Sequence, residues 1–254
     1  MRHFWTILSH EVRMLLVSPS TYIAATFFLA TMGFTFTGIL EDYSQAPLDV
    51  SPVIAFFRLF WAPVLIMVPL LTMRCLAEER RLGTMETLLT TPVTAAEIVL
   101  GKYGAAYALY SGLWALTGGF FYILRRFADD PKLLDPGPLE GGYLFIAVSG
   151  LLFVALGVLA SALSRNQAVA GIICSVMLLA LIGGSFYLGT RPAWLEAESL
   201  RPLKAAFDYV QIFRHYDDFT RGVVDLRQVL FYLSGTVLAL IFSIFAVEAK
   251  QLQA

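Results

Sequence analysis

The chain has 254 residues, of which 58% are hydrophobic and 15% charged, with a formal net charge of −1 at pH 7. Soluble domains average about 45–50% apolar and about 25% charged residues, so this apolar excess is too large for one globular core. The near-neutral charge argues against a nucleic-acid partner, which needs a basic face. The two cysteines, Cys75 and Cys174, form no metal-binding motif, so no metal is expected.

The first predicted element is an amphipathic helix over residues 2–17, of the kind that lies in a membrane interface. Helical periodicity places six apolar side chains on one side: Phe4, Trp5, Leu8, Val12, Leu15 and Leu16. Polar residues lie opposite, and only Glu11 falls toward the apolar edge. Glu11 and Arg13 also interrupt the apolar run that a cleaved signal peptide would need. The alternative, a helix packed on a soluble core, has no evident soluble core to pack on.

Six later stretches are apolar and long enough to cross a bilayer, which takes roughly 20 residues. They are residues 22–40, 53–73, 102–124, 143–163, 168–188 and 229–247. Pro63 and Pro69 remove backbone donors from the second stretch and are expected to bend it. Small residues four positions apart predict close helix packing, and they occur at Gly157/Ser161, Gly171/Ser175 and Gly235/Ala239. The expected fold is therefore all-α, a single polytopic membrane domain over residues 1–254 with six transmembrane helices.

These six stretches carry little chemistry of their own. Arg58 is the one ionisable residue that we place at depth, and its long side chain can reach the headgroups. A secondary transporter or channel would be expected to keep buried ionisable groups, so this class is disfavoured. An intramembrane serine protease is also disfavoured, because His3, His10 and His215 all lie outside the stretches and leave no base for a serine. We therefore predict no enzymatic activity.

The loop at residues 74–101, between the second and third stretches, is the most informative part of the sequence. Gly83 is expected to break the helix that continues out of the second stretch. Thr84 can then cap a short helix over residues 85–89, with Glu86 near its positive end.

The same loop contains a second helix start. Thr91 and Pro92 are expected to end the short helix, and Thr94 with Glu97 forms a capping box for the helix that follows. A short helix at the membrane edge can pass motion between a soluble partner and the spans. An ordinary capped connection explains the same pattern equally well.

A family resemblance decides between these two interpretations. Residues 78–89, 91–93 and 98–102 contain, in order, an acidic-basic pair, Gly-Thr, Glu, paired Leu, Pro-Val and Gly-Lys. This pattern resembles the signature of exporter-type (type 2) ABC transporter permeases, most closely the gliding-motility-associated and nitrous-oxide-reductase-maturation subgroup. The N-terminal amphipathic helix and the six spans agree with the family more loosely.

The resemblance implies that residues 74–101 are a cytoplasmic coupling loop that binds a separate ABC ATPase subunit. Its glutamates would make polar contacts and its paired leucines would supply an apolar anchor. The implied coupling residues are Glu78, Glu79, Gly83, Thr84, Glu86, Leu88, Leu89, Pro92 and Val93. It also implies a dimer, formed with a second permease copy or a paralogue, because one bundle of this family forms half of a translocation path.

The resemblance further implies the topology, on which the lysine and arginine count is nearly silent. Both termini are expected in the cytoplasm and the chain in the cell inner (plasma) membrane. Residues 189–228 are expected to form an extracytoplasmic segment. Its aromatic residues suit an interfacial belt, with a solvated loop as the alternative; they are Phe207, Tyr209, Phe213, Tyr216 and Phe219.

The sequence contains no phosphate-binding loop, because Gly101-Lys102 lacks both the upstream Gly and the following Ser or Thr. ATP and Mg are therefore expected on the partner ATPase, and no cofactor on this chain. The leading hypothesis is a permease subunit of an ATP-driven exporter. The alternative is a membrane anchor that transmits ATPase motion to an extracytoplasmic partner without transporting a substrate.

Overall fold

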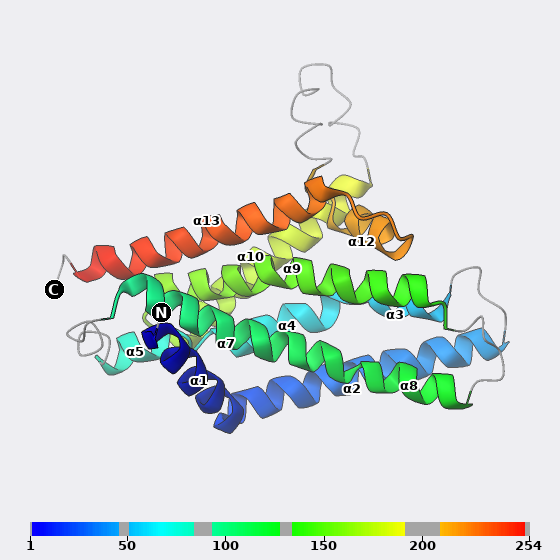
Figure 1. Ribbon diagram of the computed structural model, residues 1–254, viewed down its shortest axis with the longest axis horizontal. Helices are drawn as coiled ribbons and strands as arrows, with labels where there is room; N and C mark the ends of the chain where they lie inside the picture. The colour runs from blue at the N-terminus through cyan, green and yellow to red at the C-terminus, as the bar shows by residue number, and fades with distance from the viewer. Residues whose placement is uncertain (1, 46–50, 84–92, 128–133, 191–208, 252–254) are drawn as a thin grey trace, which may run out of the picture.

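The computed structural model describes residues 2–45, 51–83, 93–127, 134–190 and 209–251, and all regular elements in these ranges are helices (Figure 1). They are α1 (Arg2–Val17), α2 (Pro19–Gln45), α3 (Pro52–Arg58), α4 (Trp61–Thr72), α5 (Ala77–Leu82), α7 (Ala95–Leu116), α8 (Gly118–Phe127), α9 (Pro136–Leu163), α10 (Gln167–Gly189), α12 (Ile212–Thr220) and α13 (Leu226–Gln251). The predicted all-α class is confirmed for this part of the chain.

Five helical segments of the described chain are long and apolar enough to cross a membrane. They are Pro19–Gln45, Trp61–Leu82, Pro136–Leu163, Gln167–Gly189 and Leu226–Ala249. Each corresponds to one predicted stretch, so five of the six predicted spans are found as such.

The remaining predicted span, residues 102–124, has a different form. Its helix α7 begins earlier, at Ala95, and is interrupted at Thr117 before α8 continues in its place. Thr117 Oγ1 lies 2.6 Å from the carbonyl oxygen of Trp114, to which it donates, and 2.9 Å from Tyr143 Oη. The side chain thus bonds to its own turn and to α9 at the point where the helix is interrupted.

The second predicted span is also divided into two helices. α3 ends at Arg58 and α4 begins at Trp61. Pro63 has no N–H to donate to the carbonyl of Leu59, so the α-helical ladder cannot continue there. The N–H of Ala62 donates to that carbonyl instead, at 3.2 Å. The bend that Pro63 predicts is therefore a break one turn before the proline.

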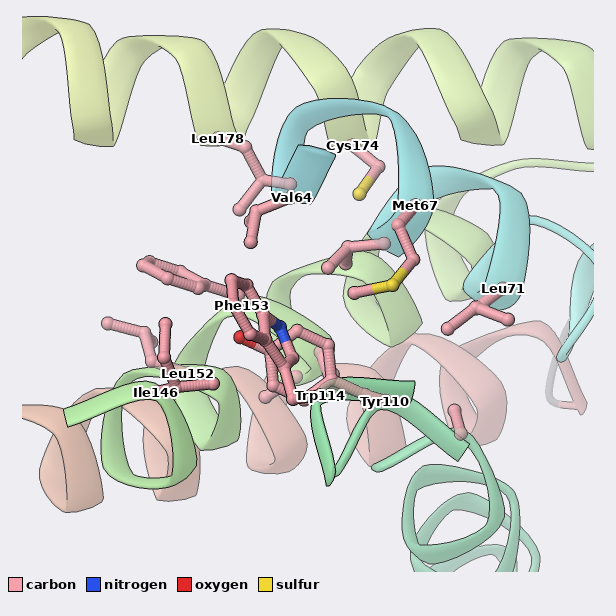
Figure 2. Close-up of a cluster of buried hydrophobic side chains, with 14 of the residues drawn as sticks. Val64, Met67, Leu71, Tyr110, Trp114, Ile146, Leu152, Phe153, Cys174 and Leu178 are labelled. Atoms are coloured by element: carbon pink, nitrogen blue, oxygen red, sulfur yellow. The ribbon is translucent and has the colours of Figure 1, made fainter. Parts of the chain in front are cut away.

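The core is centred on α9, which contacts α4, α7, α10, α12 and α13. Figure 2 shows Val64 and Met67 of α4 turned toward Tyr110 and Trp114 of α7 and Phe153 of α9. All five side chains are buried. This cluster joins α4, α7 and α9 through apolar packing.

Gly157 and Ser161 let the end of α4 and the chain that follows it approach α9 closely. A Cβ at Gly157 would overlap the side chain of Thr72. One turn later, Ser161 Oγ accepts hydrogen bonds from the backbone N–H groups of Leu76 and Ala77, at 2.9 and 3.0 Å. Those donors lie at the start of α5, where no intrahelical acceptor is available. The predicted close packing is confirmed for this pair.

The other two small-residue pairs give different results. A Cβ at Gly235 of α13 would lie 2.9 Å from Leu152 Cδ1 of α9, and Ala239 is buried in the same contact zone. A Cβ at Gly171 would meet only Met73, at 3.8 Å, which is ordinary contact. Close packing is therefore confirmed at Gly235 and not at Gly171.

The two ends of the bundle are made of different elements. α1, α5 and the last turns of α13 lie at one end, whereas α3, α8 and α12 lie toward the other (Figure 1). The helices near the two chain termini therefore share one end with the segment that the sequence singled out.

Gly141 of α9 offers a test of how tightly α12 packs. A Cβ there would overlap the backbone carbonyl of Phe219, which cannot rotate away as a side chain could. We expect Gly141→Ala to lower the free energy of unfolding in detergent by about 1–3 kcal/mol. The control is Gly184→Ala, whose Cβ would meet nothing within 4 Å and should be neutral or stabilising by up to about 1 kcal/mol. Equal effects of the two would contradict close α9–α12 packing.

Candidate functional site

A buried ion-pair cluster lies at the end of the bundle where α1, α5 and α7 meet. Lys102 of α7 is only 4% exposed. Its Nζ lies 2.6 Å from Glu11 Oε1 of α1 and 2.8 Å from Glu79 Oε1 of α5. A buried ammonium is unfavourable unless it is paired and hydrogen-bonded. The two carboxylates therefore allow this lysine to be buried, and the lysine ties both helices to α7.

The stripe of α1 that contacts the bundle differs from the predicted apolar face. Its half-buried residues recur at helical spacing: Phe4, Ile7, Leu8, Glu11, Val12 and Leu15. Trp5 and Leu16 lie outside this stripe and are 67% and 52% exposed. Four of the six predicted residues thus belong to the stripe half-buried against the bundle, and two remain accessible. The packed stripe is rotated toward Glu11, which explains why that residue lies near the apolar edge.

Two glycines of α7 bring α1 close enough for this ion pair. A Cβ at Gly101 would lie 2.7 Å from Ile7 Cγ2, and one at Gly104 would lie 3.0 Å from Leu8 Cδ1. Because these two positions lack side chains, α1 can approach the backbone of α7 directly beside Lys102. The close approach places the Glu11 carboxylate within hydrogen-bonding distance of the ammonium.

α5 is held from its other side by Arg80. The guanidinium donates to the backbone carbonyl of Ala162 near the C-terminus of α9 and, at 3.0 Å, to that of Ala246 in α13. The last carbonyls of a helix lack intrahelical donors and carry partial negative charge, so a cation is favourable beside Ala162. α5 is therefore bound to α7 through Glu79 and to α9 and α13 through Arg80.

The predicted boundaries of the loop are confirmed at both described edges. Gly83 ends α5 in the left-handed conformation, with φ 70°, which glycine adopts without steric cost. The capping box precedes α7: Thr94 Oγ1 accepts from the N–H of Glu97, and a Glu97 carboxylate oxygen accepts from the N–H of Thr94, both at 3.2 Å. The end of α5 and the start of α7, which flank residues 84–92, are therefore both capped.

The structure places some of the predicted coupling residues and not others. Thr84, Glu86, Leu88, Leu89 and Pro92 lie outside the described residues. Glu78 is half-buried on α5, and Val93 packs partly buried against the core. Glu79 was predicted to contact a partner, and in the structure it is engaged by Lys102 of its own chain.

The Glu11–Lys102–Glu79 cluster is not among the features that the sequence predicts. The ionisable residue predicted at depth is Arg58, which is exposed, whereas Lys102 is buried. One signal was present: Glu11 lies on the apolar edge of an amphipathic helix, where an unpaired carboxylate would be unfavourable. The identity of its partner could not be read from the sequence, because Lys102 lies 91 positions away.

The predicted aromatic belt before the last span is wrong for two of its residues. Tyr216 and Phe219 of α12 are fully buried, with ring centroids 5.5 and 5.9 Å from that of Phe145 in α9. They are core residues because α12 packs one face on α9. Tyr209 is half exposed, and Phe207 lies outside the described residues.

α12 also carries a buried histidine. His215 is 4% exposed, and its Nδ1 lies 3.1 Å from Tyr232 Oη of α13. Burial lowers the pKa of His215 to about 4, with Asp218 and Asp225 opposing the shift and Arg214 adding to it. The imidazole is therefore neutral at neutral pH, where it joins α12 to α13.

Comparison with known proteins relates the chain to a family of transporter proteins. Residues 39–213 match the family described as ABC-2 family transporter protein. Curated relatives are the probable multidrug ABC transporter permease YbhR of Escherichia coli strain K12 and that of strain O157:H7. Each is 26% identical over 168 residues, which cover 61% of this chain. The match covers 39% of the length of these relatives.

Lys102→Met should unfold or loosen this end of the bundle. Glu11 and Glu79, whose side chains are 18% and 19% exposed, would lose their cation. Removal of one partner from a buried ion pair costs about 3–5 kcal/mol, which is the upper limit for these partly exposed carboxylates. The measurement is the free energy of unfolding in detergent, with hydrogen exchange of α1 as a local readout. Arg13→Met, at an exposed position of the same helix, is the control and should have little effect.

A triple variant separates charge from packing at the same position. Glu11→Gln/Glu79→Gln/Lys102→Met contains no buried charge and should recover part of the lost stability. If the triple variant is as unstable as Lys102→Met alone, ion pairing is not what holds α1 and α5 in place.

Because the pKa of the buried His215 is lowered, the contact that it forms between α12 and α13 should be sensitive to acid. Its folded pKa of about 4 lies below the ordinary 6.5, so the unfolded state binds the extra proton between these values. The stability contribution is complete above pH 6.5 and is lost as the pH falls toward 4, by up to about 3 kcal/mol. Melting temperatures of wild type and His215→Gln across this range test the prediction. The two curves should converge toward pH 4, and parallel curves would contradict it.

Proposed function

The chain belongs to the ABC-2 family of transporter proteins, and we propose that it is the membrane-spanning permease subunit of an ATP-driven exporter. In this proposal it forms half of a translocation path together with a second copy or a paralogue. ATP and Mg bind a separate ABC ATPase chain, and this chain supplies no cofactor site. Within the family, residues 78–102 favour the gliding-motility-associated and nitrous-oxide-reductase-maturation subgroup.

The observation that carries the proposal is the Glu11–Lys102–Glu79 cluster. It joins the helices before and after residues 84–92 to each other and to α1. A partner that pushes on this loop would therefore move α1, α5 and α7 together rather than bend one connection. Such a unit suits the transfer of motion from an ATPase to the membrane helices.

The arrangement of the helices supports the proposed topology. α7 and α8 together would form a sixth crossing, since α7 packs beside α9 through the bundle. An even number of crossings returns the chain to its starting side, consistent with α1 and the last turns of α13 at one end (Figure 1). We place that end in the cytoplasm and the protein in the inner (plasma) membrane, because an ABC ATPase would bind there. Residues 189–228 are then extracytoplasmic.

In the proposed contact, Leu88 and Leu89 supply the apolar anchor on the ATPase, and Glu78 and Glu86 supply polar contacts. Glu79 has a different part, because Lys102 already engages it. It would position α5, and with it the helix end at Gly83, from within the chain.

The coupling proposal is tested by co-purification of the permease with its ATPase. Leu88→Asp/Leu89→Asp should abolish association and the stimulation of ATP hydrolysis, since two carboxylates cannot be buried in an apolar groove. Val223→Asp/Val224→Asp is the matched control, because both valines are exposed and closely follow α12, an element toward the other end of the bundle (Figure 1). Unchanged association of the leucine variant would exclude this loop as the docking site.

The alternative function is an ATPase-coupled membrane anchor that acts on an extracytoplasmic partner without transport. The exposed apolar residues Val223, Val224 and Leu226, beside α12, are the observation that favours it. Proteoliposomes that contain both subunits separate the two functions. An exporter moves a substrate only with hydrolysable ATP, whereas an anchor hydrolyses ATP with no movement of substrate.

A further inference from the structure

A cavity of about 950 Å³ lies between α3, α4, α10 and α12, away from the Lys102 cluster. Ligand-binding pockets typically measure about 300–1,000 Å³, so this one can hold a molecule of substantial size. Most of its wall is apolar, formed by residues that include Leu59, Leu65, Leu179, Ile182, Phe186 and Phe213.

The polar lining of the cavity is concentrated on α3 and α12. Arg58 comes from α3, and Arg214 and Asp217 come from α12. Two arginines and one aspartate thus line the cavity. Within the described part of the chain neither arginine forms an ion pair. Guanidinium groups bind carboxylate and phosphate through paired charge-assisted hydrogen bonds. The excess of positive charge therefore selects for an anionic group.

The apolar wall is open on the flank of α4 and α10. Leu179 and Phe186 of α10 line the cavity and are 58% and 63% exposed, and Trp61 of α4 is partly exposed beside them. α10 and the segment Trp61–Leu82, which begins with α4, are both long and apolar enough to cross a membrane. An apolar chain can therefore extend from the cavity along these helices into the bilayer, or enter the cavity from it.

We propose that this cavity binds an anionic amphiphile, with its acidic head on Arg58 and Arg214 and its apolar chain against α4 and α10. The inference deepens the proposed function by naming the class of molecule carried, and it rests on that function for its meaning as transport. A cationic head would meet an excess of positive charge, and a neutral head would leave that excess uncompensated. The observations thus favour an acid over either of these.

Trp61 provides a built-in probe of binding, because it lines the cavity. The permease alone, in nanodiscs of zwitterionic phosphatidylcholine, is titrated with a dibrominated fatty acid at a pH at which the acid is ionised. Its methyl ester has the same chain without the charge. The acid should quench tryptophan fluorescence at about tenfold lower concentration than the ester. Trp61→Phe should remove the quenched component.

The source of the amphiphile is distinguished by a second arm. Phosphatidylglycerol in the nanodisc competes with the brominated acid if the cavity accepts a two-chain membrane lipid. It leaves the titration unchanged if the cavity accepts only a single-chain amphiphile. Both results keep an anionic amphiphile as the ligand and identify its class more closely.

Charge variants test the head-group site. Arg58→Gln and Arg214→Gln should each weaken binding of the acid about tenfold and leave the ester unchanged. Arg221→Gln is the matched control, because Arg221 follows α12 and does not line the cavity. Equal affinities of acid and ester for the wild type would overturn the proposal.

Volume variants test the chain site without removing a charge. Gly183 lines the cavity and has room for a side chain, since a Cβ there would meet only Leu179, at 3.8 Å. Gly183→Phe should fill part of the cavity and abolish quenching of Trp61. Gly184→Phe, one position along and outside the lining, should bind the acid as the wild type does. If the two variants behave alike, the amphiphile does not occupy this cavity.

These measurements use no ATPase, so they fail or succeed independently of the coupling proposal. Association that depends on Leu88 and Leu89, together with no preference for the acid, would leave the permease function standing and remove only this inference. Binding of the acid without any ATPase association would keep the site and remove its meaning as transport.

Discussion

The fold at one end of the bundle depends on a single buried ammonium group. Lys102 cannot be buried without counter-charges, because an isolated ion loses far more hydration than packing returns. Its two carboxylates come from α1 and α5, which are distant in sequence. The docking of α1 and the position of α5 on α7 therefore both require this ammonium group. Neither helix can leave α7 without exposing or orphaning a charge.

α4 is the physical link between this end and the cavity. Its first residue, Trp61, lines the cavity, and its last residue, Thr72, lies against Gly157 of α9. The chain then passes Ser161, which accepts from the first donors of α5. α4 thus spans the distance from the cavity wall to the start of α5, and it begins just after the break ahead of Pro63.

Much of the architecture was predictable because it depends on local chemistry. The end of α5 at Gly83 and the capping box at Thr94 follow from backbone requirements that a few adjacent residues meet. Apolar stretches predicted the long helices. The positions of the helix breaks near Leu59 and at Thr117 were not predicted. At Thr117 the hydroxyl contacts Tyr143 of another helix, and no local pattern in the sequence indicates that contact. The aromatic residues of α12 were misplaced for a similar reason, because an aromatic belt and a packed aromatic core have the same composition.

The sequence by itself determined that this is an all-α membrane protein, where its principal helices lie, and which loop carries the family pattern. These properties depend on hydrophobicity, helix capping and residue order, which act within a few turns of chain. Only the tertiary structure decided that Glu11 and Glu79 meet Lys102, that two of six apolar residues of α1 stay exposed, and that Arg58 and Arg214 share a cavity. Each of these depends on side chains brought together from helices far apart in the chain, and no local pattern specifies which charge meets which.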